Sequence, residues 1–369
     1  MPEGSRDGHG GLKLQIDGLF RAGWMHVNHR ILRHVAAFVL AFWALPLVLS
    51  DCGNPICTKQ SHHLRRAHPS AASHHSASLS VAKKFELTTS PLTSISCDGD
   101  GDCLVESASD QFWSLRNGGD AVPVVPAPLV SSGTLDIGAG RVSCFSGDRC
   151  MAILFSRDVV EFVNGTWEPP VRLSLGHILT GLGCASGGSC VAIDGLGDAY
   201  LFNGHSWSNA LNAWGSAQAV SCESSQFCFA AGGGVSQWDG ISWSEPADVD
   251  PGATMTAIDC ASPENCVVVD DKGRLIRWEV DHWTPPTKVT SDAFAGVATL
   301  SDRIYVLVTG SGGLYTLGPA GLGKLGLVMG ISGRVTGLAC ASQGSVATCY
   351  LTTSRGDLYQ QRIPVSSVS

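Results

Sequence analysis

Two cysteines separated by five residues occur five times along the chain, in the stretches "SCDGDGDC", "VSCFSGDRC", "LGCASGGSC", "VSCESSQFC" and "IDCASPENC". The first cysteines stand at positions 97, 144, 184, 222 and 260, and a looser pair is formed by Cys340 and Cys349. The separations are 47, 40, 38, 38 and 80 residues, so the last interval holds two units. A cysteine-free unit is therefore expected near residue 300. Seven units of about 40 residues indicate a propeller, a solenoid or an array.

The interior of the unit distinguishes between these architectures. After each cysteine pair come a short apolar run, a polar or Gly-rich turn and a second run that ends in an aromatic residue. A tight turn such as Asn164-Gly165 follows, and these dipeptides favour two-residue hairpins. Tryptophans then stand 23, 23, 21 and 23 residues after the first cysteines, at Trp167, Trp207, Trp243 and Trp283. Short alternating strands without a helical period predict a propeller blade.

The repeat resembles that of secreted β-propeller proteins of actinobacteria, whose blades carry a motif like VSCxSxxxCxAxxxxGxxxxxxGxxW. The resemblance covers residues 83–369. It implies an all-β fold, a seven-bladed propeller with four antiparallel strands per blade. The sixth unit lacks both cysteines, and the first lacks the final tryptophan. The motif specifies the type of repeat and leaves the function open.

In such a blade each cysteine pair spans the turn between the first and second strands, so the two residues face each other across a hairpin. Zinc is the competing interpretation, but pairs on separate blades lie too far apart to supply four ligands. We therefore expect six disulfides, each within one blade: Cys97–Cys103, Cys144–Cys150, Cys184–Cys190, Cys222–Cys228, Cys260–Cys266 and Cys340–Cys349. Disulfides of this kind indicate an oxidising compartment.

The N-terminal part has the pattern of an export signal. Basic residues precede an apolar run at positions 35–49, which is short for a membrane span. We assign residues 1–51 to a signal region, with Met25 as a candidate start, and residues 52–82 to a low-complexity linker rich in His, Ser and Ala. Cys52 is either lipidated, which would tether the chain to the membrane, or joined to Cys57 by a disulfide. These two interpretations stay open.

Charge argues against one class of partner. Only 15% of the residues are charged, and residues 83–369 hold 16 Lys and Arg against 28 Asp and Glu, a net charge of −12. Such a surface repels phosphate backbones, so nucleic acid is not an expected partner. We expect a monomer outside the cell or at the outer face of its membrane, bound to a protein, peptide or glycan.

Acidic residues supply the candidate ligand-binding positions. The connections between second and third strands are expected on one face, opposite the cysteine pairs, and they hold Glu106 and a set of aspartates. The predicted ligand-binding set is Asp110, Asp158, Asp194, Asp198, Asp270, Asp271 and Asp357. Ordinary Asp and Gly turn chemistry is the alternative explanation, and it is the simpler one. Asp98, Asp100 and Asp102 alternate as at the start of a calcium loop, although the later ligands of such a loop are missing.

Catalytic patterns are scarce. The propeller region contains three histidines, His177, His205 and His282, and no triad, nucleotide-binding or sialidase motif. No catalytic residue or cofactor other than calcium is therefore assigned. The predicted function is a non-catalytic binding or scaffold module. The alternative is an extracellular hydrolase or lyase with carboxylates drawn from several blades.

The last unit predicts how the ring closes. It supplies three strands and ends without a fourth. Upstream of the first cysteine pair, residues 84–89 have the layout of an outer strand. We expect this segment to pair beside "DLYQQRI" and so to cover an exposed edge.

Overall fold

The computed structural model describes residues 79–125, 141–146, 148–154, 157–174, 176–213, 215 and 217–365. All of them belong to one compact unit, Ala72–Ser369. These residues form 29 strands and no α-helix, so no helix among them is long and apolar enough to cross a membrane. The predicted signal region, Cys52, Cys57 and most of the predicted linker lie outside the described residues.

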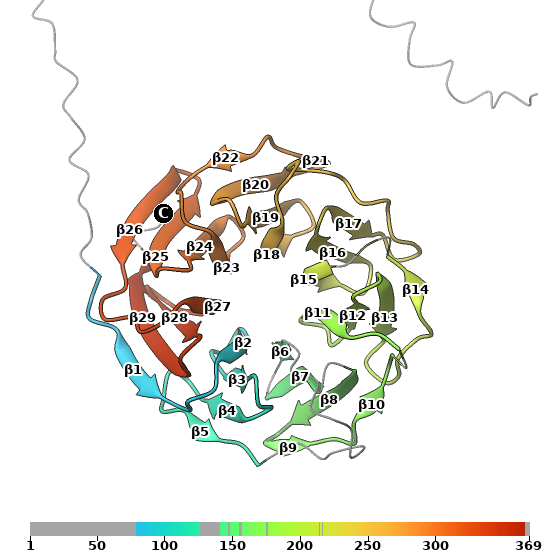
Figure 1. Cartoon of the computed structure of the whole chain (residues 1–369), viewed down its shortest axis with the longest axis horizontal. Coiled ribbons are helices and arrows are strands. Elements are labelled where there is room, and N and C mark those ends of the chain that lie inside the picture. The colour runs from blue at the N-terminus through green and yellow to red at the C-terminus, as the bar shows by residue number, and fades with distance from the viewer. Residues whose placement is uncertain are drawn as a thin grey trace, which may run out of the picture. The chain divides into compact units, whose positions relative to one another are not determined.

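Seven antiparallel sheets stand around a common axis, as Figure 1 shows. The first strand of each sheet lies nearest the axis, and each contacts the first strand of the next sheet round the whole ring. The predicted seven-bladed propeller is confirmed. We call the end that carries the turns between first and second strands, such as residues 98–102 and 225–226, the clasp face. The opposite end, where second strands connect to third strands, is the loop face.

The first four blades follow the chain in order. Their strands are β2 Leu92–Cys97, β3 Cys103–Ser107, β4 Phe112–Leu115 and β5 Val122–Pro123 in blade 1; β6 Val142–Ser146, β7 Arg149–Leu154, β8 Asp158–Val163, β9 Thr166–Trp167 and β10 Val171–Arg172 in blade 2; β11 Leu179–Cys184, β12 Cys190–Asp194, β13 Asp198–Phe202 and β14 Leu211–Asn212 in blade 3; β15 Ala217–Ser224, β16 Phe227–Gly232 and β17 Val235–Trp238 in blade 4.

The remaining blades include both ends of the described chain. Their strands are β18 Met255–Ser262, β19 Asn265–Asp270, β20 Arg274–Glu279, β21 His282–Trp283 and β22 Thr287–Lys288 in blade 5; β23 Phe294–Ser301, β24 Ile304–Thr309, β25 Gly313–Gly318 and β26 Gly321–Leu327 in blade 6; β27 Val335–Gln343, β28 Val346–Thr353, β29 Asp357–Pro364 and β1 Lys83–Glu86 in blade 7.

Blade 4 departs from the four-strand pattern. Its sheet has three strands, and the outer position is held by single bridges, Val235 with Ala247 and Trp238 with Trp243. Pro246 precedes Ala247 and has no N–H to donate to a ladder, which keeps this outer segment short.

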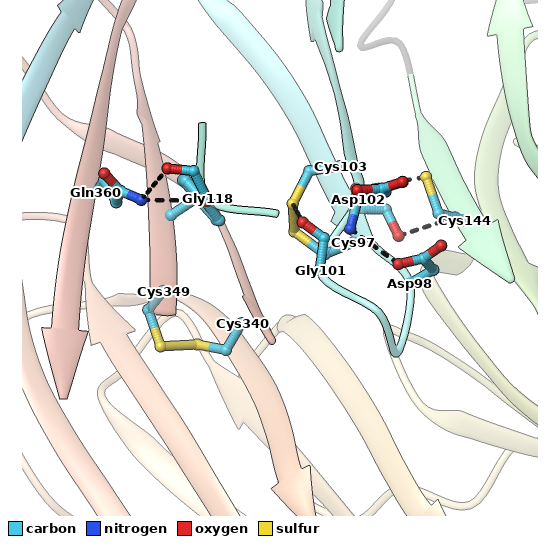
Figure 2. The surroundings of a disulfide bond; sticks show 12 residues. Cys97, Asp98, Gly101, Asp102, Cys103, Gly118, Cys144, Cys340, Cys349 and Gln360 are labelled. Atoms are coloured by element: carbon cyan, nitrogen blue, oxygen red, sulfur yellow. Dashed lines mark hydrogen bonds between the residues drawn. A yellow bond between two sulfur atoms is a disulfide. The ribbon is translucent and has the colours of Figure 1, made fainter. Parts of the chain in front are cut away.

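The six predicted disulfides are all present. In each blade that has one, the two cysteines are direct partners across the first and second strands. Their Cα atoms lie only 3.9–4.1 Å apart, the close approach of a directly opposed antiparallel pair. Figure 2 shows two of these bonds, in blades 1 and 7.

The cysteine-free sixth blade is confirmed, and it replaces its disulfide with other bonds. Thr299 and Tyr305 are strand partners at the positions that cysteines hold in the other blades. The Tyr305 hydroxyl donates a hydrogen bond to the Asn265 carbonyl of blade 5 over 2.7 Å. Tyr305 therefore fastens blade 6 to its neighbour, whereas a disulfide would have fastened two strands of one blade.

Seven clusters of buried apolar side chains form the core, and each cluster draws on two adjacent blades. The buried apolar side chains of each blade thus pack against those of its neighbours. Burial of this kind makes each blade depend on both neighbours, including the pair formed by blades 7 and 1.

The two ends of the described chain close the ring, as predicted. Strand β1 pairs with β29, from Lys83 opposite Gln360 to Glu86 opposite Asp357. The pairing ends three residues earlier than the predicted 84–89, because the N–H groups of Leu87 and Thr88 both bond to the Gly356 carbonyl and turn the chain away. Gly356 has a φ of +83°, and a Cβ there would lie 1.9 Å from the Thr88 carbonyl oxygen.

We predict that Gly356→Ala weakens this closure. Alanine would have to adopt a left-handed conformation and would also collide with the Thr88 backbone, so β1 would move off β29. We expect the free energy of unfolding to fall by about 2–3 kcal/mol more than in a control variant, measured by urea denaturation.

The control is Gly344→Ala in the same blade. Gly344 has a φ of +66°, and no atom lies within 4 Å of the position that a Cβ would take, so this variant carries the backbone strain without the collision. Equal losses of stability in the two variants would contradict a closure that depends on Gly356.

Candidate functional site

A cavity of about 650 Å³ opens along the ring axis toward the clasp face. Its walls come from the first strands of all seven blades, among them Val142 of β6, Val220 of β15 and Leu338 of β27. The first cysteines of the six disulfides also line it. Every blade therefore contributes to one concave site, which is the arrangement expected of a ligand pocket.

Hydrogen bonds join neighbouring first strands around this cavity. In blades 1, 2, 4 and 5 the side chain before the first-cysteine position accepts a bond from the backbone N–H at the corresponding position of the next blade. Ser96 bonds Cys144 over 2.9 Å, Ser143 bonds Cys184 over 3.0 Å, Ser221 bonds Cys260 over 3.0 Å and Asp259 bonds Thr299 over 2.7 Å. The serine of the repeat motif thus connects blades.

Blade 3 has glycine at the corresponding position. A Cβ on Gly183 would lie 2.6 Å from the Val220 carbonyl oxygen of blade 4. The first strands of blades 3 and 4 therefore approach through their backbones, and a serine side chain would not fit between them.

Three carboxylates line the cavity, and the described lining contains no Lys, Arg or His. Desolvation raises the pKa of the partly buried Asp259, while hydrogen bonds from Thr299, Ser221 and Cys260 act in the opposite direction. Burial, with the nearby Asp259 and Asp302, raises the pKa of Glu223 to about 7. Glu223 is therefore only partly ionised at neutral pH, and a cation that approaches it favours loss of the carboxyl proton.

The predicted calcium residues do not gather around one point. Asp98 is buried, and one of its oxygens accepts the N–H groups of Asp100 and Asp102 over 3.0 and 2.9 Å. Asp100 is exposed, whereas Asp102 accepts the N–H of Asn117 over 3.0 Å. Within the described ranges no three His, Cys, Asp or Glu side chains are arranged to hold a metal ion. Figure 2 shows Asp98 and Asp102 beside the blade 1 disulfide. Calcium binding stays a prediction.

Several of the predicted ligand-binding aspartates hold turns at the loop face. Asp194 accepts the N–H groups of Leu196 and Asp198, both over 3.0 Å. Asp270 accepts those of Lys272 and Arg274 over 2.9 and 2.8 Å. The same position at the end of the second strand is Ser107, Thr309 or Thr353 in other blades, and each hydroxyl accepts the N–H four residues later. A hydrogen-bonding side chain here is thus a feature of the repeat.

The other predicted aspartates differ in their surroundings. Asp158 is buried and paired with Arg172 over 2.7 Å, and Asp357 is buried and paired with Lys84 over 3.2 Å. Asp110, Asp198 and Asp271 keep part of their surface exposed. None of the seven lines the axial cavity, which lies at the opposite end of the blades. Whether they bind a ligand stays a prediction.

Glu106, predicted in a loop, lies instead in β3 at a core position. It is fully buried and neither carboxylate oxygen has a hydrogen-bond partner, so burial raises its pKa well above the ordinary value. Asp110 raises this pKa further, and Arg141 lowers it. Glu106 therefore contributes little to the charge of the loop face.

No protein-family model and no curated protein matches the sequence. Many solved structures share its fold. A structure of U3-55K matches with a TM-score of 0.62 and 12% identity, over 77% of this chain and 98% of the other. A crystal structure of RRP9 WD40 repeats matches with a TM-score of 0.63 and 14% identity, over 76% of this chain and 97% of the other.

A third structure, YCF48 bound to D1 peptide, matches with a TM-score of 0.58 and 16% identity, over 76% of this chain and 97% of the other. Identities this low show the fold alone. The chain shares the β-propeller fold of these structures, and its function must be argued from its own site.

A substitution at Asp259 would test whether the hydrogen bonds between first strands stabilise the folded ring. Asp259→Ala would leave the backbone N–H of Thr299 without its acceptor and would break the bond to Ser221. We expect the free energy of unfolding to fall by about 2 kcal/mol, measured by urea denaturation at pH 7.

Asp302→Ala is the matched control, because Asp302 is an exposed aspartate of blade 6 close enough to Glu223 to affect its pKa. It should change stability by less than about 0.5 kcal/mol. A loss in Asp259→Ala no larger than in this control would show that the carboxylate does not hold the strands.

Proposed function

We propose that this propeller is an exported, non-catalytic binding module that acts outside the cell or at the outer face of its membrane. Its ligand is a basic segment of a protein or peptide, which enters the axial cavity from the clasp face. The observation that carries this proposal is the cavity itself, built by all seven blades and lined by carboxylates with no described basic side chain.

Charge and shape favour a basic segment as the ligand. A lysine or arginine side chain is long enough to reach into a cavity and keeps its charge across the physiological range of pH. Phe145 is the one aromatic side chain in the described lining, so the cavity offers little stacking surface for a sugar ring. A protein or peptide is therefore the better fit than a glycan.

The disulfides support a location outside the cytoplasm. Six bonds in one domain persist in an oxidising compartment, whereas cytosolic thiols are kept reduced. The predicted export signal agrees with this location.

A hydrolase or lyase is the second candidate, and the raised pKa of Glu223 inside a cavity favours it. Acid and base catalysis by a carboxylate pair needs two groups that are free to exchange protons. Asp259 and Asp98 both use their oxygens to bond backbone N–H groups. His177, His205 and His282 are exposed and lie outside the lining. Glu223 thus has no evident catalytic partner among the described residues.

Binding of a basic peptide should depend on the ionisation of Glu223. Because its pKa is about 7, the carboxylate gains charge as the pH rises from 6 to 8. We expect the affinity for an acetylated trilysine peptide to rise on the order of tenfold over this range, measured by isothermal titration calorimetry at low salt. Glu223→Gln should abolish most of that rise.

Glu245→Gln, an exposed glutamate in the outer part of blade 4, should keep the pH dependence of the unmodified protein. Identical pH profiles for Glu223→Gln and the unmodified protein would refute a site at Glu223. Turnover of a polysaccharide or ester substrate that is lost in Glu223→Gln would instead support the enzyme.

A further inference from the structure

One position in the repeat decides how the space between two neighbouring blades is filled at the clasp face. In blades 2 to 5 it holds a tryptophan, which is the strand partner of an aromatic residue in its own blade: Trp167 with Phe162, Trp207 with Phe202, Trp243 with Trp238 and Trp283 with Trp278. These tryptophans pack into the clusters shared with the preceding blade. Each therefore fills the space between two blades.

Blade 6 has Leu322 at this position, as the strand partner of Leu317. Leu322 is 42% exposed and is absent from the core cluster between blades 5 and 6. The corresponding residues of blades 1 and 7, Ala121 and Ala82, are partly buried and pack against their clusters. Leu322 is thus the exposed member of the seven.

The facing wall at this place carries a valine. The residue directly after the second cysteine is Phe229 in blade 4, whose ring lies 5.0 Å from that of Trp283. In blade 5 the same position is Val267, which faces blade 6. Val191 holds the same position in blade 3 and packs in one cluster with Trp243, so a valine wall accommodates an indole, and only the tryptophan is missing between blades 5 and 6.

A groove of about 430 Å³ occupies this space. Val267, Trp278, Tyr305 and Leu317 line it. Arg303 stands exposed at the rim, and no bond from its side chain to another described residue is seen. The groove shares no lining residue with the axial cavity.

The rim carries one further feature. Val280 lines the groove, is 70% exposed and has a φ of +62°. A β-branched residue is rarely found in this conformation. At the equivalent position of blade 2 the residue with positive φ is Asn164. An apolar side chain thus stands at the rim of the groove in a backbone conformation that disfavours it, and such outliers cluster at binding sites.

We infer that the groove between blades 5 and 6 is a binding site for an aromatic side chain, preferably an indole, presented by a partner polypeptide. Four equivalent positions in this chain hold an indole between two blades, so the groove is a tryptophan site whose own tryptophan is missing. The partner would supply what the repeat omits, and aromatic anchors in pockets are the usual centres of protein interfaces. This inference goes beyond the axial cavity and does not depend on it.

Leu322 does not itself line the groove, but its neighbour Gly321 and its strand partner Leu317 do. Leu322→Trp tests the inference, because it would restore the side chain of the repeat at the edge of the groove. The probe is N-acetyltryptophanamide, with N-acetylleucinamide as the apolar comparison, observed by NMR on the unmodified full chain. We expect the tryptophan probe to shift the methyl resonances of Val267 and Leu317, and we expect at least tenfold weaker binding to Leu322→Trp.

The control is Leu327→Trp, which adds an indole at an exposed residue of the same strand, at the end of β26 away from Gly321 and the groove. It should bind the probe as the unmodified protein does and should unfold at a lower temperature than Leu322→Trp. Equal binding of the probe to the two variants, or equal shifts with the leucine probe, would overturn the inference.

A measurement on the unmodified protein covers the case in which Leu322→Trp fails to fold. A photoreactive derivative of the tryptophan probe should crosslink to residues 264–267, 277–280 or 317–321, identified by mass spectrometry. Crosslinks confined to other segments would overturn the inference.

The polypeptide partner has its own test. Linear peptides selected by display on the unmodified protein, and then depleted on Leu322→Trp, should be enriched in Trp, Tyr or Phe. Absence of that enrichment would refute a partner peptide. Sedimentation that shows a dimer in the unmodified protein and a monomer in Leu322→Trp would also refute it, because the aromatic side chain would then come from a second copy.

Discussion

The hydrogen bonds between neighbouring first strands are the interaction on which the rest of the ring depends. A blade buries most of its apolar side chains against its neighbours, so it is stable only where the next blade stands at the correct distance and height. In blades 1, 2 and 4 the serine before the first cysteine helps to set that relation, since Ser96, Ser143 and Ser221 each accept a bond from the cysteine N–H of the next blade. The disulfide then fixes the hairpin that carries this side chain.

Hydrogen bonds to backbone N–H groups also engage two of the three carboxylates of the cavity. Asp259 uses its carboxylate to hold Thr299, and Asp98 uses one oxygen to hold its own turn, so these two charges are committed to the fold. Glu223 follows a cysteine and lines the cavity, and no backbone N–H bond to its carboxylate is seen among the described residues. Its raised pKa results mainly from burial, with the two neighbouring aspartates adding to it. The free charge of the site is therefore concentrated in one residue that responds to pH and to a bound cation.

The sequence predicts the architecture well because the cysteine period and the tryptophan offset are local signals that recur. It places all six disulfides, the cysteine-free blade and the closing strand. It does not predict the axial cavity, because the cavity is formed by residues about 40 positions apart, one from each unit. An overlay of the units would still have given a signal, since Asp259 stands where blades 1, 2 and 4 have serine and the other blades have glycine or alanine. The aspartates of the loop face could not be separated into turn residues and exposed residues without the hydrogen bonds that Asp194 and Asp270 make.

Positions where a blade lacks a residue of the repeat motif are the places to look for function in this propeller. Blade 6 has lost its cysteines and its tryptophan, yet Tyr305 and Asp259 bind it to blade 5 through hydrogen bonds. These two hydrogen bonds offset the stability that blade 6 loses without its disulfide and tryptophan. The groove between blades 5 and 6 stays open. Filling that groove would require only a larger side chain at Leu322, a change that blades 2 to 5 already contain. Single replacements that stabilise a protein are readily available to it. A groove that stays unfilled between two blades that are otherwise well bonded therefore indicates a site kept for a ligand.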